Sequence, residues 1–183
     1  MSIKHVILDR DGVLNREAPD GSYVTQPGDF QWLPGALIAL AALRGAGIRV
    51  SVATNQAGIG RGILSLEQLS AVHERMQAEA VAAGATLDAI LFCPHAPEAH
   101  CDCRKPAAGL IRSALARCGI APEETLVVGD DGRDLEAARR AGVRAALVRT
   151  GKGRQAEVQL QGTDVPVYDD LAQLAHAIVT GAL

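Results

Sequence analysis

Aromatic residues are scarce in this chain of 183 residues, in which Phe, Trp and Tyr together make up only 3%. Proteins that bind single-stranded nucleic acid stack bases on such side chains, and a formal net charge of −3 without a long basic run also argues against a nucleic-acid surface. No apolar run approaches the roughly 20 residues of a membrane span. A strand-like run begins too early for a signal peptide to precede it. We therefore expect a cytoplasmic protein with no nucleic-acid or membrane partner.

Cysteine is also infrequent, and its distribution is uneven. Of the four cysteines, Cys93, Cys101 and Cys103 lie close together, whereas Cys118 stands apart on a predicted helix. In a reducing compartment such clustering indicates metal binding before disulfides. The chain length is most simply one domain, residues 1–183, long enough for a hydrophobic core, and we expect a monomer.

Short β-branched runs alternate with helical patterns along the whole chain. Strands are predicted at 5–9, 48–54, 87–92, 125–129, 144–149 and 165–168, and helices at 34–45, 66–83, 107–118, 133–141 and 170–180. Ser65 and Gln68 form a capping-box start for the second helix, and 151–163 is a polar surface loop or a short helix. This alternation predicts an α/β fold with a doubly wound, mostly parallel sheet covered by helices on both faces.

Polar residues cluster just after the predicted strands, where ligands bind in folds of this kind. Lys105 precedes the third helix and can reach the same crevice. The residues that follow the strands are Asp9, Asp11, Thr54, Asn55, Cys93, His95, Asp130, Asp131, Asp134, Thr150 and Lys152. The sequence thus predicts an acidic centre with one hydroxyl group and one or two cations.

Asp9 and Asp11 stand one residue apart, and like charges at that separation raise each other's pKa unless a cation offsets them. With Asp130 they form a set of oxygen ligands without soft partners, which suits Mg²⁺. Thr54 and Lys105 are suitable donors to phosphate oxygens. One carboxylate can then act as nucleophile, and the other can protonate the leaving oxygen and activate water.

Each of these motifs has a simpler explanation when it is taken alone. Asp-x-Asp-Gly favours a turn, Thr-Asn after a strand often caps a helix, and a lysine before proline is commonly solvated surface. Their occurrence in order, each at a strand end or a helix start, favours a common site.

A second cluster lies in FCPHAPEAHCDCRKP, residues 92–106. Cys93-x-His95 and Cys101-x-Cys103 supply three thiolates and one imidazole, enough for a closed tetrahedral zinc site. His100 is a competing ligand, but His95 is favoured because Cys-x-His mirrors Cys-x-Cys. Four protein ligands leave no open position, so this zinc is expected to be structural and to fix the approach of the lysine that follows.

The set DRDGVLN, TNQAGIGRG, CRKP and GDDGRD resembles the four motifs of the haloacid dehalogenase (HAD) superfamily of aspartate-nucleophile phosphatases. The resemblance implies a Rossmann-like HAD fold in which Asp9 is the nucleophile and Asp11 the general acid/base. It also implies that Thr54 and Lys105 hold the phosphoryl group, with Asn55 nearby.

The same resemblance implies that Mg²⁺ is held by Asp9, the backbone carbonyl of Asp11, and Asp130. Asp134 matches the second acid of the fourth motif. The role of Asp131, where many relatives have lysine, stays open.

The cysteine loop, together with TNQ-x-GI-x-RG, is similar to that of the D-glycero-D-manno-heptose 1,7-bisphosphate phosphatases, with the histidinol-phosphate phosphatases as a close branch. This implies removal of the 7-phosphate of a sugar bisphosphate on the path to a surface glycan such as lipopolysaccharide. The segments between the motifs, from Asp11 to Thr54 and from Thr54 to Lys105, are too short to contain a large cap domain. Arg61 and Arg104 are candidates to bind a sugar hydroxyl or a second phosphate. For Arg61, a solvated position on a loop is expected as much as a contact with the substrate.

Three other readings stay open. A phospho-accepting receiver domain shares the acidic cluster, but its phosphorylated aspartate follows the third strand, whereas here the acidic pair follows the first. A nucleic-acid 3′-phosphatase would share the catalytic core, against the acidic composition of this chain. The third alternative is histidinol phosphate as the substrate.

Overall fold

A computed structural model describes residues 2–18 and 21–183. Within these residues a single six-stranded sheet has the order β3-β2-β1-β4-β5-β6, and all its pairings are parallel. The strands are β1 (His5–Leu8), β2 (Arg49–Asn55), β3 (Ala89–Cys93), β4 (Thr125–Gly129), β5 (Arg144–Val148) and β6 (Val167–Tyr168). The predicted doubly wound α/β fold is therefore confirmed.

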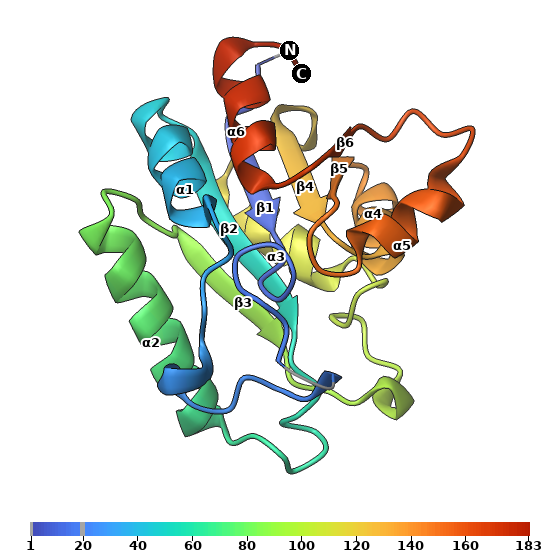
Figure 1. Ribbon diagram of the computed structural model, residues 1–183. Coiled ribbons are helices and arrows are strands. Elements are labelled where there is room, and N and C mark those ends of the chain that lie inside the picture. The colour runs from blue at the N-terminus through green and yellow to red at the C-terminus, as the bar shows by residue number, and fades with distance from the viewer. Residues whose placement is uncertain (1, 19–20) are drawn as a thin grey trace.

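Helices cover both faces of this sheet (Figure 1). On one face pack α1 (Ala36–Gly45), α2 (Leu66–Ala82) and α6 (Leu171–Thr180), and on the other pack α3 (Gly109–Cys118) and α4 (Gly132–Ala141). A short α5 (Gly153–Glu157) and a 3₁₀ turn, Val158–Leu160, follow β5. Both conformations expected for 151–163, loop and short helix, thus contribute to that segment.

Side chains on the two faces of the sheet pack into two separate hydrophobic cores. Val6 and Leu8 of β1 point into the core beneath α1, α2 and α6, whereas Ile7 points into the core beneath α3 and α4. Side chains of a strand alternate between the two faces of a sheet. A central strand buried on both faces is therefore apolar throughout, which explains the uninterrupted run HVIL.

Several element boundaries differ from prediction by one or two residues, for local reasons. Helix α1 begins at Ala36 rather than Pro34, because Gly35 precedes it in a left-handed conformation with φ 77°. Strand β3 begins at Ala89 rather than Leu87, since the Asp88 carboxylate accepts a hydrogen bond from the backbone N–H of Val50 at 2.8 Å.

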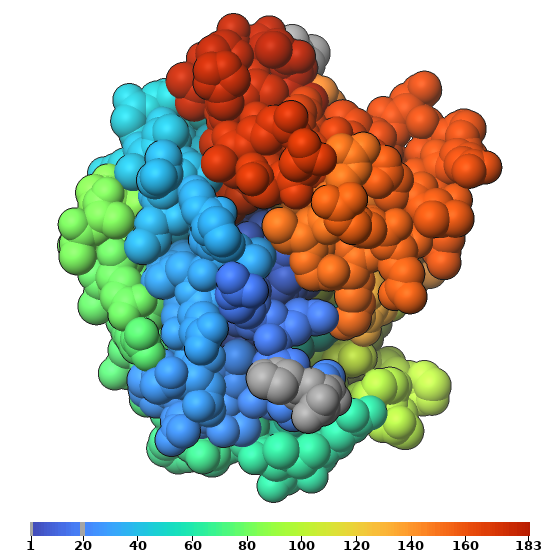
Figure 2. Space-filling view, viewed as in Figure 1, coloured from blue at the N-terminus to red at the C-terminus, as the bar shows by residue number. Residues whose placement is uncertain are grey.

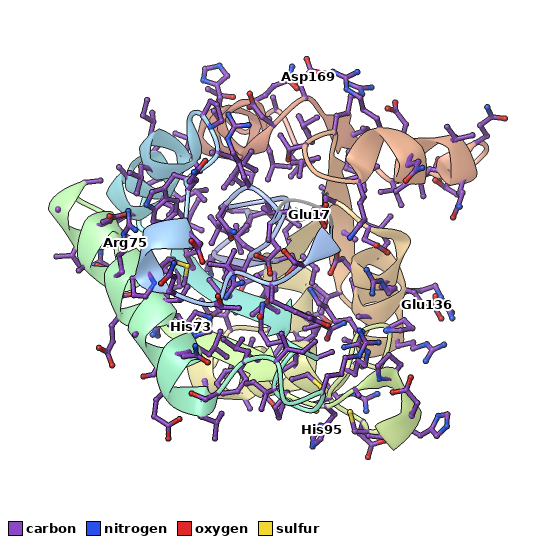
Figure 3. All side chains as sticks on the ribbon, turned by 60° about the horizontal axis from the view of Figure 1, so that its bottom comes forward. Glu17, His73, Arg75, His95, Glu136 and Asp169 are labelled. Carbon is purple, nitrogen blue, oxygen red and sulfur yellow. The ribbon has the colours of Figure 1, made fainter. Side chains whose placement is uncertain are left out.

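Strands β1 and β4 are neighbours at the centre of the sheet, with the chain continuing outward in opposite directions on either side. At such a switch point the loops leave a crevice beyond the carboxyl ends of the strands. In the segment between β1 and α1 that borders it, Pro27–Asp29 form a 3₁₀ turn, and the described residues of this segment include no large cap. This segment is held on α2 by Trp32, whose Nε1 donates to Glu79 at 2.6 Å, and by Arg75, which contacts the Pro27 carbonyl (Figure 3). Among the described residues no helix is long and apolar enough to cross a membrane.

Candidate active site

The first strand ends at the predicted nucleophile. The backbone N–H of Asp9 bonds to the carbonyl of Val128 at 3.0 Å, which fixes Asp9 beside the end of β4. Its carboxylate lies 2.9 Å from Nζ of Lys105. The pKa of Asp9 is raised to about 6, because burial and then the negative charge of Asp134 raise it by more than the positive charge of Lys105 lowers it.

Lys105 is the cation of this centre, and its side chain is only 3% exposed. Its Nζ also lies 2.6 Å from the buried carboxylate of Asp134. Burial opposes the charged form, but Asp134 and Asp9 outweigh it and hold the pKa of Lys105 above its usual value. Asn55 fixes the lysine backbone from both sides: its amide nitrogen donates to the Lys105 carbonyl, and its amide oxygen accepts from the Lys105 N–H, each at 3.0 Å.

The carboxylate of Asp11 turns away from the other acids into a network of donors. Arg10 donates to both of its oxygens, through Nη2, at 2.8 and 2.9 Å. Asn15 and Gln56 each add one hydrogen bond at 2.9 Å. Burial opposes ionisation of Asp11, but the Arg10 charge and these hydrogen bonds outweigh it and lower its pKa below the usual value.

The network of Asp11 continues to the predicted phosphate-binding hydroxyl. Gln56, which is buried, also donates from Nε2 to Oγ1 of Thr54 at 2.9 Å. Thr54 lies at the end of β2 and is buried as well. One amide group thus fixes the second acid and the hydroxyl relative to each other.

Three other carboxylates do converge. One oxygen each from Asp9, Asp130 and Asp134 lies within 4.8 Å of the others. Burial, followed by the charge of Asp9, raises the pKa of Asp130 to about 8, although the Lys152 N–H donates to its Oδ2 at 2.8 Å. Among the described residues, the ammonium group of Lys105 is the only one that pairs with this cluster. Buried acids with so little compensation are suited to bind a hard divalent cation.

Glycine at two positions lets the backbone approach Asp130. Gly12 has φ +84° and Gly151 has φ +55°, and a Cβ at either position would overlap the Asp130 carboxylate. The Thr150 hydroxyl donates to the Gly12 carbonyl at 2.6 Å and ties the two loops together. The glycine of DxDG is therefore required both by its backbone conformation and by the space that Asp130 occupies.

A cavity of about 240 Å³ opens above these groups. In the view of Figure 2 the blue segment after β1 spreads over the middle, with the teal segment near residue 60 below it and the yellow-green segment near residue 100 to the lower right. The polar and charged residues that line the cavity include Asp9, Asp11, Glu17, Tyr23, Thr54, Asn55, Arg104, Lys105, Asp130, Asp131, Arg133, Asp134 and Lys152.

The two arginines predicted to contact substrate lie differently. Arg104 lines the cavity beside Lys105, and its Nη1 is 3.4 Å from the His95 carbonyl. Arg61 is exposed and does not line the cavity; its Nη1 donates to the hydroxyl of Tyr23, which does line it, at 3.1 Å.

The fourth motif contains a residue whose function the sequence left open. The side chain of Asp131 accepts from the Arg133 N–H at 3.0 Å and caps α4, in a capping box completed by Asp134. Its carboxylate also pairs with the Arg133 guanidinium at 2.7 Å. Asp131 is thus engaged with helix α4, and it does not belong to the acid cluster.

Residues that the sequence reasoning missed include Arg10, Asn15 and Gln56. All three lie inside the motifs DRDGVLN and TNQAGIGRG, but nothing in the spacing of the motifs indicated that they bind Asp11.

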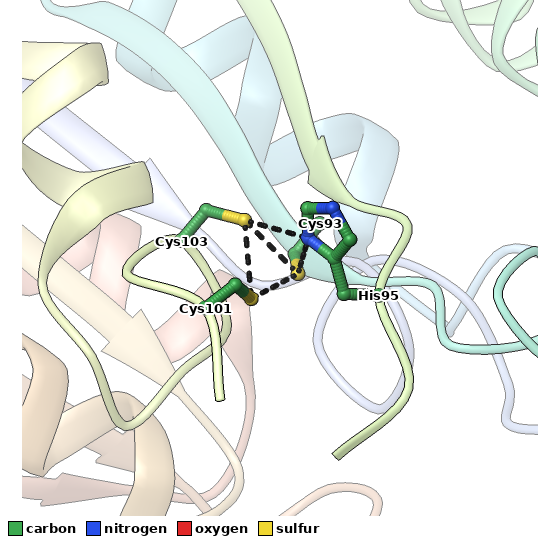
Figure 4. Close-up of side chains that lie close together, drawn as sticks. All are labelled: Cys93, His95, Cys101 and Cys103. Atoms are coloured by element: carbon green, nitrogen blue, oxygen red, sulfur yellow. Dashed lines mark hydrogen bonds between the residues drawn. The ribbon is translucent and has the colours of Figure 1, made fainter. Parts of the chain in front are cut away.

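The cysteine loop forms a compact cluster at the end of β3 (Figure 4). The Sγ atoms of Cys93, Cys101 and Cys103 lie 3.2–3.6 Å from one another. Nδ1 of His95 lies 3.3 Å from Sγ of Cys103 and 3.6 Å from Sγ of Cys93. These four atoms lie within 4.8 Å of one another, and His100 is not part of the group.

The relatives found by comparison with known proteins agree with one another in family. The HAD-hydrolase-like family model matches residues 102–174. The D-glycero-beta-D-manno-heptose-1,7-bisphosphate 7-phosphatase of Pseudomonas putida is 39% identical over 97% of this chain and 100% of the relative. The D-glycero-alpha-D-manno-heptose-1,7-bisphosphate 7-phosphatase of Mycobacterium tuberculosis is 38% identical over 94% of this chain and 90% of the relative.

A solved structure has the same fold over the full length. The crystal structure of D,D-heptose 1,7-bisphosphate phosphatase from B. bronchiseptica, complexed with magnesium and phosphate, matches with a TM-score of 0.91. It is 39% identical and covers 98% of this chain and 99% of that one. The chain belongs to the heptose-1,7-bisphosphate phosphatase family of the HAD-like hydrolases.

Proposed function

We propose that this enzyme removes the 7-phosphate of D-glycero-D-manno-heptose 1,7-bisphosphate through an aspartyl-phosphate on Asp9. The observation that carries the proposal is the convergence of Asp9, Lys105 and Asp130 at the floor of the cavity, in a chain 39% identical to phosphatases of this name. Relatives named for the alpha and beta anomers are almost equally similar, at 38% and 39%. Overall similarity therefore does not select the anomer, and both belong in the assay.

We infer that Mg²⁺ is held by Asp9, Asp130 and the backbone carbonyl of Asp11, with Asp134 as a further carboxylate beside it. The donor set fits: the cluster offers hard oxygen ligands, and burial leaves two of its carboxylates with raised pKa values. When bound, the ion neutralises charge on the phosphoryl oxygens.

The residues of the chain then divide the chemistry in two steps. In the first, an Asp9 oxygen attacks phosphorus while Thr54 and Lys105 hold the phosphoryl oxygens, and Asp11 gives its proton to the leaving sugar oxygen. In the second, water attacks the aspartyl-phosphate, the P–O bond to Asp9 breaks, and Asp11 takes the proton of the water. The donors around Asp11 favour its carboxylate form, which the second step uses.

We further propose a structural zinc at Cys93, His95, Cys101 and Cys103. The four ligand atoms are already gathered, and they are three sulfurs and one imidazole nitrogen, the set that structural zinc prefers. The loop continues directly into Arg104 and Lys105. A metal there would hold the start of the segment that carries the lysine into the cavity.

The experiment that tests the proposal compares kcat/KM for heptose 1,7-bisphosphate of both anomers, histidinol phosphate and a 3′-phosphorylated oligonucleotide, with magnesium present. We expect the sugar bisphosphate to lead by at least about tenfold, or roughly 1.4 kcal/mol of transition-state binding. Equal or reversed preference would refute the substrate assignment.

The nucleophile is tested separately by Asp9→Asn, which should abolish turnover in a folded protein. Asp169→Asn is the control, because Asp169 is exposed and pairs with Arg149 away from the cavity (Figure 3). Retained activity in Asp9→Asn would remove Asp9 as the attacking group.

A further inference from the structure

Arg10 stands between the two acids of the first motif and is completely buried, at 1% exposure. An arginine carries five N–H donors and no acceptor, so its burial requires several acceptors around it. Asp11 supplies two, through contacts from Nε at 3.2 Å and from Nη2 at 2.8 and 2.9 Å. These contacts engage one edge of the guanidinium and leave Nη1 directed away from the acid.

The contact on the Nη1 side comes from a residue of helix α2. Nε2 of His73 lies 3.2 Å from Nη1 of Arg10, and the imidazole is buried on the inner side of the helix (Figure 3). Because arginine only donates, Nε2 of His73 must accept. His73 is therefore neutral, with its proton on Nδ1. Burial and the charge of Arg10 lower its pKa to about 3, which agrees with that state.

A guanidinium held along one edge can still rock about that edge. The contact of Nη1 with His73 fixes its plane, and with it the position of the carboxylate that it binds. Asn15 and Gln56 bind Asp11 as well, but each is a neutral amide with a single hydrogen bond to it. The Arg10 guanidinium is therefore the principal restraint on the Asp11 carboxylate, and His73 of α2 holds this guanidinium in place.

We propose that His73 is a positioning residue that acts through Arg10 to hold the Asp11 carboxylate ready for the second chemical step. The inference rests on the proposed function, because it takes Asp11 as the group that accepts a proton from water. In that step the water oxygen bonds to phosphorus, the electron pair of the broken P–O bond returns to Asp9, and the proton goes to Asp11. A carboxylate that is ionised and fixed serves this step.

The test is His73→Phe, which keeps a ring of similar size and removes the acceptor, assayed with p-nitrophenyl phosphate. p-Nitrophenolate is a stable anion that leaves without a proton, so the first step does not need Asp11 as acid. We expect kcat to fall about tenfold and KM to fall with it. The ratio kcat/KM depends only on the steps up to and including cleavage of the ester, so it should stay within about twofold of the wild-type value. A burst of p-nitrophenolate should precede the steady state.

His73→Gln is the rescue variant, since its side-chain oxygen can take the place of Nε2, and it should recover most of kcat. Phe92→Leu is the matched control, because the ring centroids of Phe92 and His73 lie 6.0 Å apart but phenylalanine offers Arg10 no hydrogen-bond acceptor. It should show neither a burst nor a fall in kcat. If His73→Phe does not fold, His73→Asn, which is too short to reach Arg10, replaces it.

Asp11→Asn separates the two possible failures. It should give the same burst with a larger loss of kcat. If Asp11→Asn shows no burst, the proposed role of Asp11 is wrong and the inference on His73 is wrong with it. If Asp11→Asn shows the burst and His73→Phe does not, the role of Asp11 stands and His73 only packs. Equal losses in His73→Phe and Phe92→Leu would likewise overturn the positioning role.

Discussion

Replacing Lys105 with methionine tests how much of the folded state depends on the charge at the floor of the cavity. Nζ of Lys105 lies 2.6 Å from Asp134 and 2.9 Å from Asp9, and the three side chains are 3%, 2% and 15% exposed. Methionine has a similar shape but no charge. The variant therefore leaves two acids in a poorly solvated place with their ammonium partner removed.

The expected magnitude follows from this burial. Removing one member of a buried ion pair costs about 3–5 kcal/mol, because the remaining charge is left uncompensated. For a chain of this size, 1 kcal/mol shifts Tm by about 2–4 °C, so Tm should fall by roughly 6–20 °C. Millimolar magnesium should raise Tm more in the variant than in the wild type if the ion binds these acids, but activity should not return.

The assay is thermal unfolding followed by circular dichroism at pH 7, with Lys4→Met as the control. Lys4 also makes a 2.6 Å ion pair, with Glu124, but these side chains are 59% and 33% exposed. Surface pairs of this kind contribute about 0–1 kcal/mol. If Lys105→Met and Lys4→Met lower Tm by the same small amount, the argument from burial is wrong.

The other predictions concern the zinc loop, a buried histidine and the glycine of the first motif. Chelation, or Cys103→Ser, should lower Tm and release zinc measurable by metal analysis, whereas Cys118→Ser should do neither; an unchanged melting curve after chelation would mean that the loop holds no metal. Burial lowers the pKa of His5 to about 4, so between pH 6.5 and 4 the unfolded chain binds more protons than the folded one and stability falls as pH falls. Urea unfolding at pH 7 and 4.5 should show His5→Gln losing less stability than wild type, by up to about 3 kcal/mol; parallel losses would contradict this. Gly12→Ala should abolish most activity, because the new methyl group overlaps the Asp130 carboxylate, and near-normal kcat/KM would show that this backbone can shift freely.

The sequence by itself determined the architecture and indicated the polar residues that meet at the ends of the strands. Alternating apolar runs and helical patterns predicted the parallel sheet, since the periodicity of each element is local. Because parallel strands end at one edge, the residues that follow β1, β2 and β4 were expected to meet, and the structure brings Asp9, Thr54, Asn55 and Asp130 to one cavity. The close spacing of the cysteines likewise predicted their cluster.

Only the tertiary structure decided which atoms contact one another. It places Asp134 rather than the carboxylate of Asp11 in the acid cluster, and it engages both ends of the Asn55 amide with the Lys105 backbone. It also brings His73 to Arg10 across 63 residues of sequence. These contacts depend on the register at which α2 and the loops pack against the ends of the strands, and that register is set by side chains distant in the chain, which no local pattern encodes.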